Sequence, residues 1–233
     1  MPNRPWIWRQ RWVNLLFAHW PVPASAARRL IPASLNLEVE EFAGTAWVGL
    51  VPFQMEDVMF RGLPEVPRFS RFPEMNLRLS VTHKGRPGVW FVSLDATNPL
   101  AVWGARRFAH LPYFEAAMQV QIDGHRVRYD SVRRAADRPV IFRGSYWPTS
   151  NVFEAAPGSL EHFLTERYRL YTAGPDQRLL TIDIHHQPWA LQYAAADIVE
   201  NTVAEAQGLP LIGRPLLHYS RRQGTIGWTI ALV

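Results

Sequence analysis

The sequence predicts a mainly β protein whose antiparallel sheet closes into a barrel or split barrel. Stretches of alternating apolar and polar residues recur along the chain, turn residues separate them, and helical periodicity is confined to short segments. Hairpins that follow one another without regular intervening helices indicate an antiparallel sheet. About ten strands are too many for a flat sheet with manageable edges, so closure is expected.

The strands are predicted from alternation, which is clearest in 74–82, where every second residue is apolar. The turn 84–88 and the dipeptide Asp123-Gly124 are typical of hairpin connections. A turn at Gln223-Gly224 is expected to divide the last two strands. We expect strands at 35–40, 46–51, 74–82, 89–94, 118–122, 125–131, 140–147, 168–172, 179–186, 218–222 and 225–232.

Helical segments are predicted to be few. Asn98 is a suitable N-cap with Pro99 at the first helical position, and Ser159 is a second suitable N-cap. Gly208 is expected to end the last helix. The expected helices are 23–30, 100–108, 160–165 and 197–207.

The composition predicts a single domain over residues 1–233. Of 233 residues 48% are hydrophobic, which is enough to bury a sizeable core. The absence of cysteine excludes disulfides and thiolate metal sites. We see neither a signal peptide nor an apolar run near the roughly 20 residues of a membrane helix. A cytoplasmic protein without a membrane partner is therefore expected.

The basic residues are almost all arginine. Lys and Arg total 25 against 20 acidic residues, yet Lys84 is the only lysine. The arginines are scattered in ones and twos, which is more typical of genome composition than of a binding surface. We expect no nucleic-acid partner.

Glu74, Asn76 and Arg78 share one face of the expected strand 74–82. If that face is exposed, they are ordinary surface residues, since polar strand faces are usually solvated. If it lines a barrel, it is a polar pocket wall with a carboxylate and a guanidinium able to pair. The alternation leaves both alternatives open.

Other candidate residues have equally good structural explanations. Asp95 suits either a site carboxylate or a turn or capping role. Arg106-Arg107 lies late in the helix 100–108, where cations suit the helix dipole. His185 and His186 are adjacent on a strand and point to opposite faces, so they form no metal site. No phosphate-binding or dinucleotide motif is present, and we expect neither metal nor cofactor.

Several segments together resemble a known family. They begin with Phe72-Pro73-Glu74-Met75-Asn76-Leu77-Arg78, which is followed in order by 88–96, 104–106, 111–113, 163–168, 186–189 and 218–220. The run from Glu74 to Tyr113 is specific, and the remaining segments support it. The chain resembles the YqjF-like family, a domain of unknown function (DUF2071) in the acetoacetate decarboxylase-like superfamily. The resemblance implies an antiparallel β-barrel or cone-shaped double sheet with a few short helices and an internal cavity.

The resemblance also bears on mechanism. In acetoacetate decarboxylase a glutamate matching Glu74 faces the cavity, which favours the interior alternative. That enzyme needs a lysine that condenses with its ketone substrate. The lysine pair is expected at Arg106-Arg107 here, and arginine stays protonated and forms no such imine. Lys84 lies in a hairpin turn, so Schiff-base chemistry is not expected.

We therefore expect a pocket for a small carboxylate or oxo-acid, since arginines bind carboxylates bidentately. The alternative is a lyase or hydrolase that uses Glu74 as general acid or base, with an arginine stabilising negative charge. A nucleic-acid or partner-binding module ranks last, and a homo-oligomer is left open. The expected site comprises Glu74 as the catalytic candidate and Arg78, Arg106, Tyr113, Glu166 and His186 as ligand-binding candidates.

Overall fold

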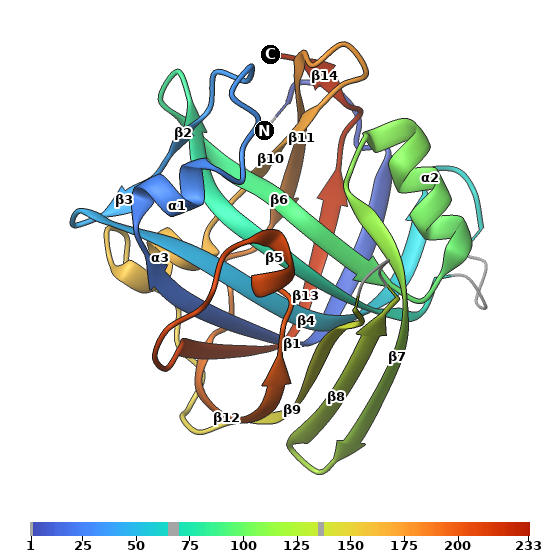
Figure 1. Ribbon diagram of the computed structural model, residues 1–233. Helices are drawn as coiled ribbons and strands as arrows, with labels where there is room; N and C mark the ends of the chain where they lie inside the picture. The colour runs from blue at the N-terminus through green and yellow to red at the C-terminus, as the bar shows by residue number, and fades with distance from the viewer. Residues whose placement is uncertain (1, 65–69, 135–137) are drawn as a thin grey trace.

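The computed structural model of the chain describes residues 2–64, 70–134 and 138–233. In these residues fourteen strands form one large mixed sheet that curves into a ring, with few helices (Figure 1). The predicted mainly β, closed fold is confirmed. The strands are β1 (Trp8–Val22), β2 (Glu38–Val39), β3 (Glu41–Phe42), β4 (Thr45–Phe60), β5 (Phe72–His83), β6 (Arg86–Ala96), β7 (Tyr113–Asp123), β8 (Arg126–Arg133), β9 (Val140–Pro148), β10 (Arg169–Ala173), β11 (Leu179–His186), β12 (Gln192–Asn201), β13 (Leu216–Gly227) and β14 (Ala231–Leu232). The helices are α1 (Ala24–Arg28), α2 (Pro99–Ala109), α3 (Leu160–Thr165) and the 3-10 helix η1 (Glu205–Gln207).

The strand pairing closes the sheet twice. The strands β13, β1, β4, β5 and β6 lie side by side, and we call them the shared wall. One closure runs from β6 through β7, β8, β9 and β12 back to β13, and these four strands lie in the lower part of Figure 1. The other runs from β6 through β10 and β11, which also pairs with β13. Within the described residues all pairs are antiparallel except β6 with β7 and β6 with β10.

Strand β5 is buried on both faces because it lies within the shared wall. Leu77 and Leu79 on one face are fully buried. On the other face Glu74 is 3% exposed and Asn76 is 6% exposed. The polar face of this strand is therefore interior, which resolves the two alternatives left by the alternation.

Two apolar clusters pack against opposite faces of the shared wall. The larger contains Leu16, Leu50 and Leu77 together with Tyr129 and Phe142 from β8 and β9. The smaller packs on the side of Glu74 and Arg78, and we call that side of the wall the Glu74 face. Its buried members are Leu15, Phe17, Val51, Phe53, Met55, Phe72, Ala96, Val102, Trp189 and Leu191.

A bend in β1 brings Phe17 onto the Glu74 face. Asn14 has a φ of 52°, and the register between β1 and β4 shifts by one residue between Val13 and Ala18. Asparagine tolerates this left-handed conformation better than most residues. The hydroxyls of Tyr146 and Tyr219 donate hydrogen bonds of 2.7 Å to Asn14, to its carbonyl and side-chain oxygens respectively. These contacts hold the bend in place.

Several local predictions are confirmed. The β5–β6 hairpin turns at Lys84 and Gly85, with φ values of 49° and 72°, as a tight two-residue turn requires. The Asn98 side chain caps α2 by accepting from the backbone N–H of Leu100 (3.1 Å) and of Ala101 (3.2 Å). Ser159 caps α3 through the N–H of His162.

Other local predictions are wrong. In the segment predicted as a helix at 197–207, residues 197–201 belong to strand β12, because pairing with β9 decides their conformation, and only η1 is helical. The strand predicted at 35–40 is reduced to β2. Strand β13 continues through Gln223-Gly224, where Gly224 stays paired with Arg11 of β1. Strand β1 itself was not predicted.

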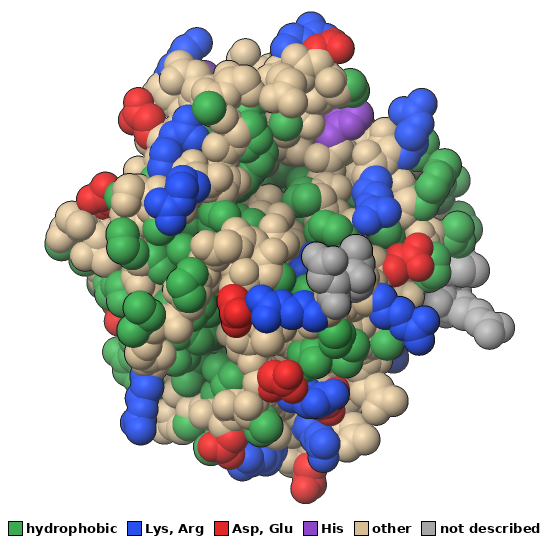
Figure 2. Space-filling view, in the orientation of Figure 1, with side chains coloured by type: hydrophobic (Ala, Val, Ile, Leu, Met, Phe, Trp, Pro, Cys, Tyr) green, Lys and Arg blue, Asp and Glu red, His purple; other side chains and the backbone are tan. Residues whose placement is uncertain are grey.

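The surface agrees with the scattered distribution of arginine. Figure 2 shows basic side chains dispersed among acidic and apolar ones on the face in view, without a continuous stripe. No helix in the described residues is long and apolar enough to cross a membrane.

Candidate functional site

Glu74 is held in the interior by a tyrosine. The hydroxyl of Tyr113, at the start of β7, donates a hydrogen bond of 2.9 Å to Oε2 of Glu74. The strand order explains the contact, because β6 lies between β5 and β7 and pairs Ala96 with Glu74. Tyr129 donates a bond of 2.8 Å to the backbone carbonyl of Glu74 from the opposite side of the wall. Glu74 is therefore fixed at both its side chain and its backbone.

Burial changes the charge of Glu74. The pKa of Glu74 is raised to about 8, chiefly because burial removes the carboxyl group from water; the Tyr113 hydrogen bond opposes the rise, and the nearby negative charge of Asp95 adds to it. A carboxyl group with this pKa carries its proton at neutral pH. Glu74 is thus a neutral acid that can donate a hydrogen bond or a proton.

Asp95 lies on the opposite face of the wall, where it pairs with an arginine. It is opposite Met75 in the β5–β6 register, and its Oδ1 is 3.3 Å from Nε of Arg133. Both side chains are almost fully buried, at 1% and 4% exposure. Burial raises the pKa of Asp95 to about 6, and Arg133 opposes this rise. Asp95 is therefore part of an ion pair and acts on Glu74 only through its charge.

Arg78 lies further along β5 on the Glu74 face. One of its terminal nitrogens (Nη2) donates a hydrogen bond of 3.0 Å to the carbonyl of Leu164, and its guanidinium carbon lies 5.1 Å from the ring centre of Phe17. Burial and the neighbouring Arg167 lower the pKa of Arg78 to about 9, so it remains charged at neutral pH. No carboxylate among the described residues forms an ion pair with Arg78.

Glu74 and Arg78 do not contact each other in the described structure, although the sequence allowed a pair. They are four positions apart along the strand, which is roughly 13 Å. Asn76 lies between them, and its side-chain oxygen Oδ1 is buried without a hydrogen-bond partner. The Glu74 face therefore presents a neutral acid, an amide and a cation in a row.

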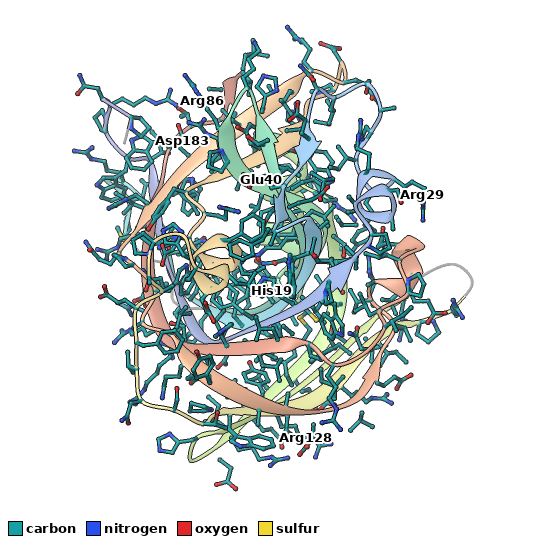
Figure 3. The ribbon with its side chains drawn as sticks, turned by 90° about the vertical axis from the view of Figure 1, so that its left-hand side faces the viewer. His19, Arg29, Glu40, Arg86, Arg128 and Asp183 are labelled. Carbon is teal, nitrogen blue, oxygen red and sulfur yellow. The ribbon has the colours of Figure 1, made fainter. Side chains whose placement is uncertain are left out.

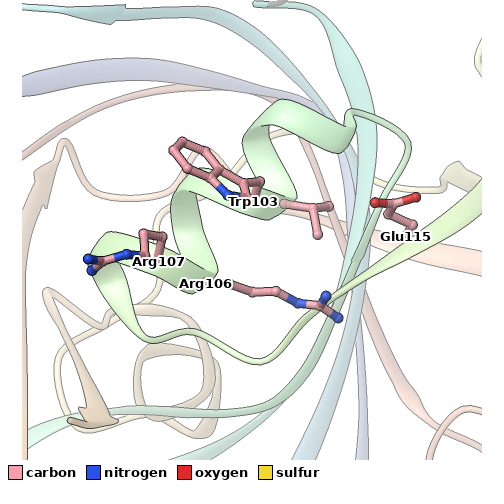
Figure 4. Close-up of a pocket in the computed structure, with 5 residues that line it drawn as sticks. Trp103, Arg106, Arg107 and Glu115 are labelled. Atoms are coloured by element: carbon pink, nitrogen blue, oxygen red, sulfur yellow. The ribbon is translucent and has the colours of Figure 1, made fainter. Parts of the chain in front are cut away.

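Arg106 lies at the surface, away from the Glu74 face. It is exposed on α2, and its Nε donates a hydrogen bond of 2.6 Å to the carbonyl of Tyr113. Figure 4 shows it extending toward β7 in a surface pocket of about 380 Å³, with Trp103 and Arg107 on the helix and Glu115 opposite. Arg106 supports Tyr113 through its backbone.

Glu166 and His186 are buried and occupied by structural contacts. The Glu166 carboxylate accepts bonds from the Trp189 backbone N–H (2.8 Å) and the Tyr168 hydroxyl (2.5 Å). The ring nitrogens of His186 lie 2.7 Å from the Gln187 carbonyl and 3.3 Å from the Arg167 carbonyl. Both residues fix the segments that carry Arg167 and Trp189 beside the Glu74 face.

Three residues that we did not single out as site candidates from the sequence lie near Arg78 or near its neighbour His19. They are His19 in β1, Arg167 after α3 and His218 in β13. Burial and neighbouring cations keep the pKa of His19 well below its usual value, and burial lowers the pKa of His218. The one sequence signal for His19 is the alternation of β1 after Asn14, which places His19 on the same face as Phe17. It was missed because β1 was not predicted.

The sequence matches a known family over most of its length. Residues 9–224 match the model of DUF2071, a family of uncharacterized conserved proteins. The uncharacterized protein YqjF of Bacillus subtilis is 46% identical over 231 residues, which cover 99% of this chain and 94% of that protein.

Two solved structures are similar in fold. The enduracididine biosynthesis enzyme MppR complexed with pyruvate has a TM-score of 0.65 at 15% identity, over 100% of this chain and 91% of that chain. Acetoacetate decarboxylase from Legionella pneumophila has a TM-score of 0.65 at 13% identity, over 100% of this chain and 92% of that chain. At these identities the likeness concerns the fold alone.

Proposed function

We propose that this chain, which belongs to the DUF2071 family, binds a small carboxylate or oxo-acid on the Glu74 face. The observation that carries the proposal is Arg78, an interior guanidinium that forms no ion pair with a carboxylate in the described residues. An interior charge without a counter-charge is costly, and a ligand carboxylate would supply one. The Arg78 residue keeps some accessible surface and is not wholly enclosed by the protein.

Glu74 supports an oxo-acid rather than a simple fatty acid. A neutral carboxyl group donates a hydrogen bond, which suits a ligand carbonyl or hydroxyl oxygen. The apolar side chains of Phe17, Val51 and Phe53 lie between the polar ends and suit the carbon skeleton. The fold neighbour that binds pyruvate, an oxo-acid, adds support by analogy. Tyr113, Arg106, Glu166 and His186 are assigned positioning roles.

Calorimetry with pyruvate, longer 2-oxo and 3-oxo acids and acetate tests the proposal. We expect at least one oxo-acid to bind, and Arg78→Met to weaken it about ten- to a hundredfold, the usual value of a charged hydrogen bond. Arg128→Ala is the matched control, because this exposed arginine lies far from His19 at the bottom of Figure 3. Binding that is unchanged in Arg78→Met would refute the proposal.

A second candidate function, catalysis by Glu74, is favoured by its raised pKa. A lyase or hydrolase needs an acid that keeps its proton at neutral pH and gives it to an oxygen that gains negative charge. Activity over oxo-acids and their esters should then fall as the pH rises through about 8 and should be lost in Glu74→Gln. A screen of these compounds without turnover would count against catalysis while leaving the binding proposal intact.

A further inference from the structure

Three residues on neighbouring strands of the shared wall stand directly opposite one another. Gly49 of β4 is in register with His19 of β1 and with Arg78 of β5. A side chain at position 49 would place its Cβ 2.8 Å from Cδ2 and Nε2 of His19 and 3.5 Å from Cγ of Arg78. The imidazole and the arginine stem therefore occupy the space over the glycine. Figure 3 shows His19 near the centre of the molecule.

His218 lies on the next strand along. It stands opposite Phe17 in the β13–β1 register, so it shares the face of Phe17 and His19. His218 is fully buried, and neither of its ring nitrogens has a hydrogen-bond partner in the described residues. Nδ1 of His19 is buried and equally without a partner. Two interior imidazoles with unmet hydrogen bonds are unusual, because buried polar groups are nearly always paired.

Arg167 completes the group. A terminal nitrogen (Nη2) lies 3.0 Å from the Glu40 carboxylate, and its Nε has no hydrogen-bond partner among the described residues. The charge of Arg167 acts on both Arg78 and His19, which places the three close together. The acidic groups nearby are Glu40, paired with Arg167, and Glu161, which acts on His218.

We propose that His19, Arg78, Arg167 and His218 together form the receptor for the carboxylate of the ligand, with the two imidazoles donating N–H groups to it. The inference rests on the proposed function and extends it, since it assigns the anion to four residues rather than to Arg78 alone. A carboxylate accepts about four hydrogen bonds, which would satisfy donors that the protein leaves unmet. Arg167 is already paired with Glu40, so one guanidinium charge remains free. The site therefore selects a monoanionic carboxylate over a dianionic phosphate.

One member of the receptor, Arg167, borders a surface groove. A surface groove of about 790 Å³ has Arg167 in its wall, together with Arg86, Tyr168, Asp183 and His185. Arg86 and Asp183 lie above Glu40 and His19 in Figure 3, and Arg167, which pairs with Glu40, belongs both to the groove wall and to the receptor. A ligand larger than pyruvate could therefore keep its carboxylate inside and its remainder in the groove.

The direct test is NMR of the histidine ring signals while pyruvate, acetate or inorganic phosphate is added to the wild-type protein. His19→Phe and His218→Phe assign the signals, and the exposed His125 of the β7–β8 turn is the internal control. We expect pyruvate and acetate to shift the His19 and His218 signals, phosphate to do so more weakly, and His125 to stay unchanged. If none of these anions shifts the two signals, the receptor does not exist.

A glycine substitution tests the same site by affinity. Gly49→Ala would force the His19 ring away, and we expect at least about tenfold weaker oxo-acid binding, as for the loss of one charged hydrogen bond. Gly144→Ala is the matched control, because its Cβ would meet β12 backbone at 3.0 Å far from the receptor. Unchanged affinity in a folded Gly49→Ala protein would contradict the inference.

The outcomes separate the two proposals. Oxo-acid binding that depends on Arg78, with unmoved histidine signals, would refute the receptor and leave the proposed function standing. Phosphate that shifts both histidines while no oxo-acid binds would refute the proposed function and the carboxylate preference, and would leave a buried anion site.

Discussion

Tyr113 donates a hydrogen bond of 2.9 Å to Glu74 between strands that are not neighbours, across β6. A hydrogen bond to the charged form of a carboxyl group lowers its pKa. We therefore expect Tyr113→Phe to raise the pKa of Glu74 still further and to reduce stability by about 1 kcal/mol. Carbon-13 NMR titration of the glutamate carboxyl groups measures the first effect. Tyr219→Phe, which removes a phenol hydrogen bond to Asn14, should leave Glu74 unaffected.

The stability of the protein should depend on pH through Glu74. Its pKa is about 8 in the folded state against 4.5 ordinarily, so the folded state holds the extra proton between these values. The free energy of unfolding should therefore fall as the pH rises from 4.5 to 8, by up to roughly 5 kcal/mol. The raised pKa of Asp95 also makes the free energy of unfolding fall as the pH rises, over a lower pH range. The lowered pKa values of His19 and His218 have the opposite effect and make it rise with pH, up to the ordinary pKa of histidine.

Urea denaturation of the wild type and of Glu74→Gln across this pH range isolates the contribution of Glu74. The difference in stability between the two proteins should shift in favour of Glu74→Gln as the pH rises. A difference that stays constant with pH would show that Glu74 is ionised in the folded state.

The buried ion pair of Asp95 and Arg133 gives a third prediction. Asp95→Asn leaves Arg133 buried without a counter-charge, and we expect a loss of roughly 3–5 kcal/mol in urea denaturation. The double variant Asp95→Leu with Arg133→Met should lose less, because neither charge remains. Asp95→Asn should also lower the pKa of Glu74, since the charge of Asp95 raises it. A double variant as unstable as the single one would contradict this account.

The lone lysine gives a fourth prediction. Lys84 is exposed at the tip of the β5–β6 hairpin, just beyond the end of β5, whereas Glu74 lies near the start of that strand. Lys84→Arg should therefore bind oxo-acids like the wild type, and borohydride should trap no stoichiometric adduct on Lys84 in mass spectrometry. A stoichiometric adduct trapped on Lys84 during turnover would contradict this prediction and would support a Schiff-base mechanism.

The sequence predicted the hairpins and the helix caps because each depends on a few neighbouring residues. The turn at Lys84-Gly85 and the Asn98 cap are local features of this kind. It did not predict β1 or β12, whose extended conformation depends on partners far along the chain. For the same reason it placed Glu74 and Arg78 on one face without showing that both faces of that strand are buried.

The candidate site shows the same division. Arg106 was expected in the cavity from the resemblance, yet α2 places it at the surface, where it reaches only the carbonyl of Tyr113. His19 and His218 come from strands at opposite ends of the chain, and no short motif joins them. Strand register brings them together, and register is a property of the whole sheet.

The bend at Asn14 has a consequence for how this interior can change. Before the bend, Trp12 contacts the cluster on the Glu74 face. After the bend, Leu15, Phe17 and His19 lie on the same face, although Trp12 has an even residue number and these three have odd ones. The bend holds one extra residue of β1, so straightening the chain there without removing a residue would exchange the inward and outward sets of the following strand. Leu16 and Ala18 would then face Arg78, and the imidazole would turn into the other cluster. The extra residue at the bend thus keeps an aromatic and polar set of side chains, and not an aliphatic one, beside Arg78.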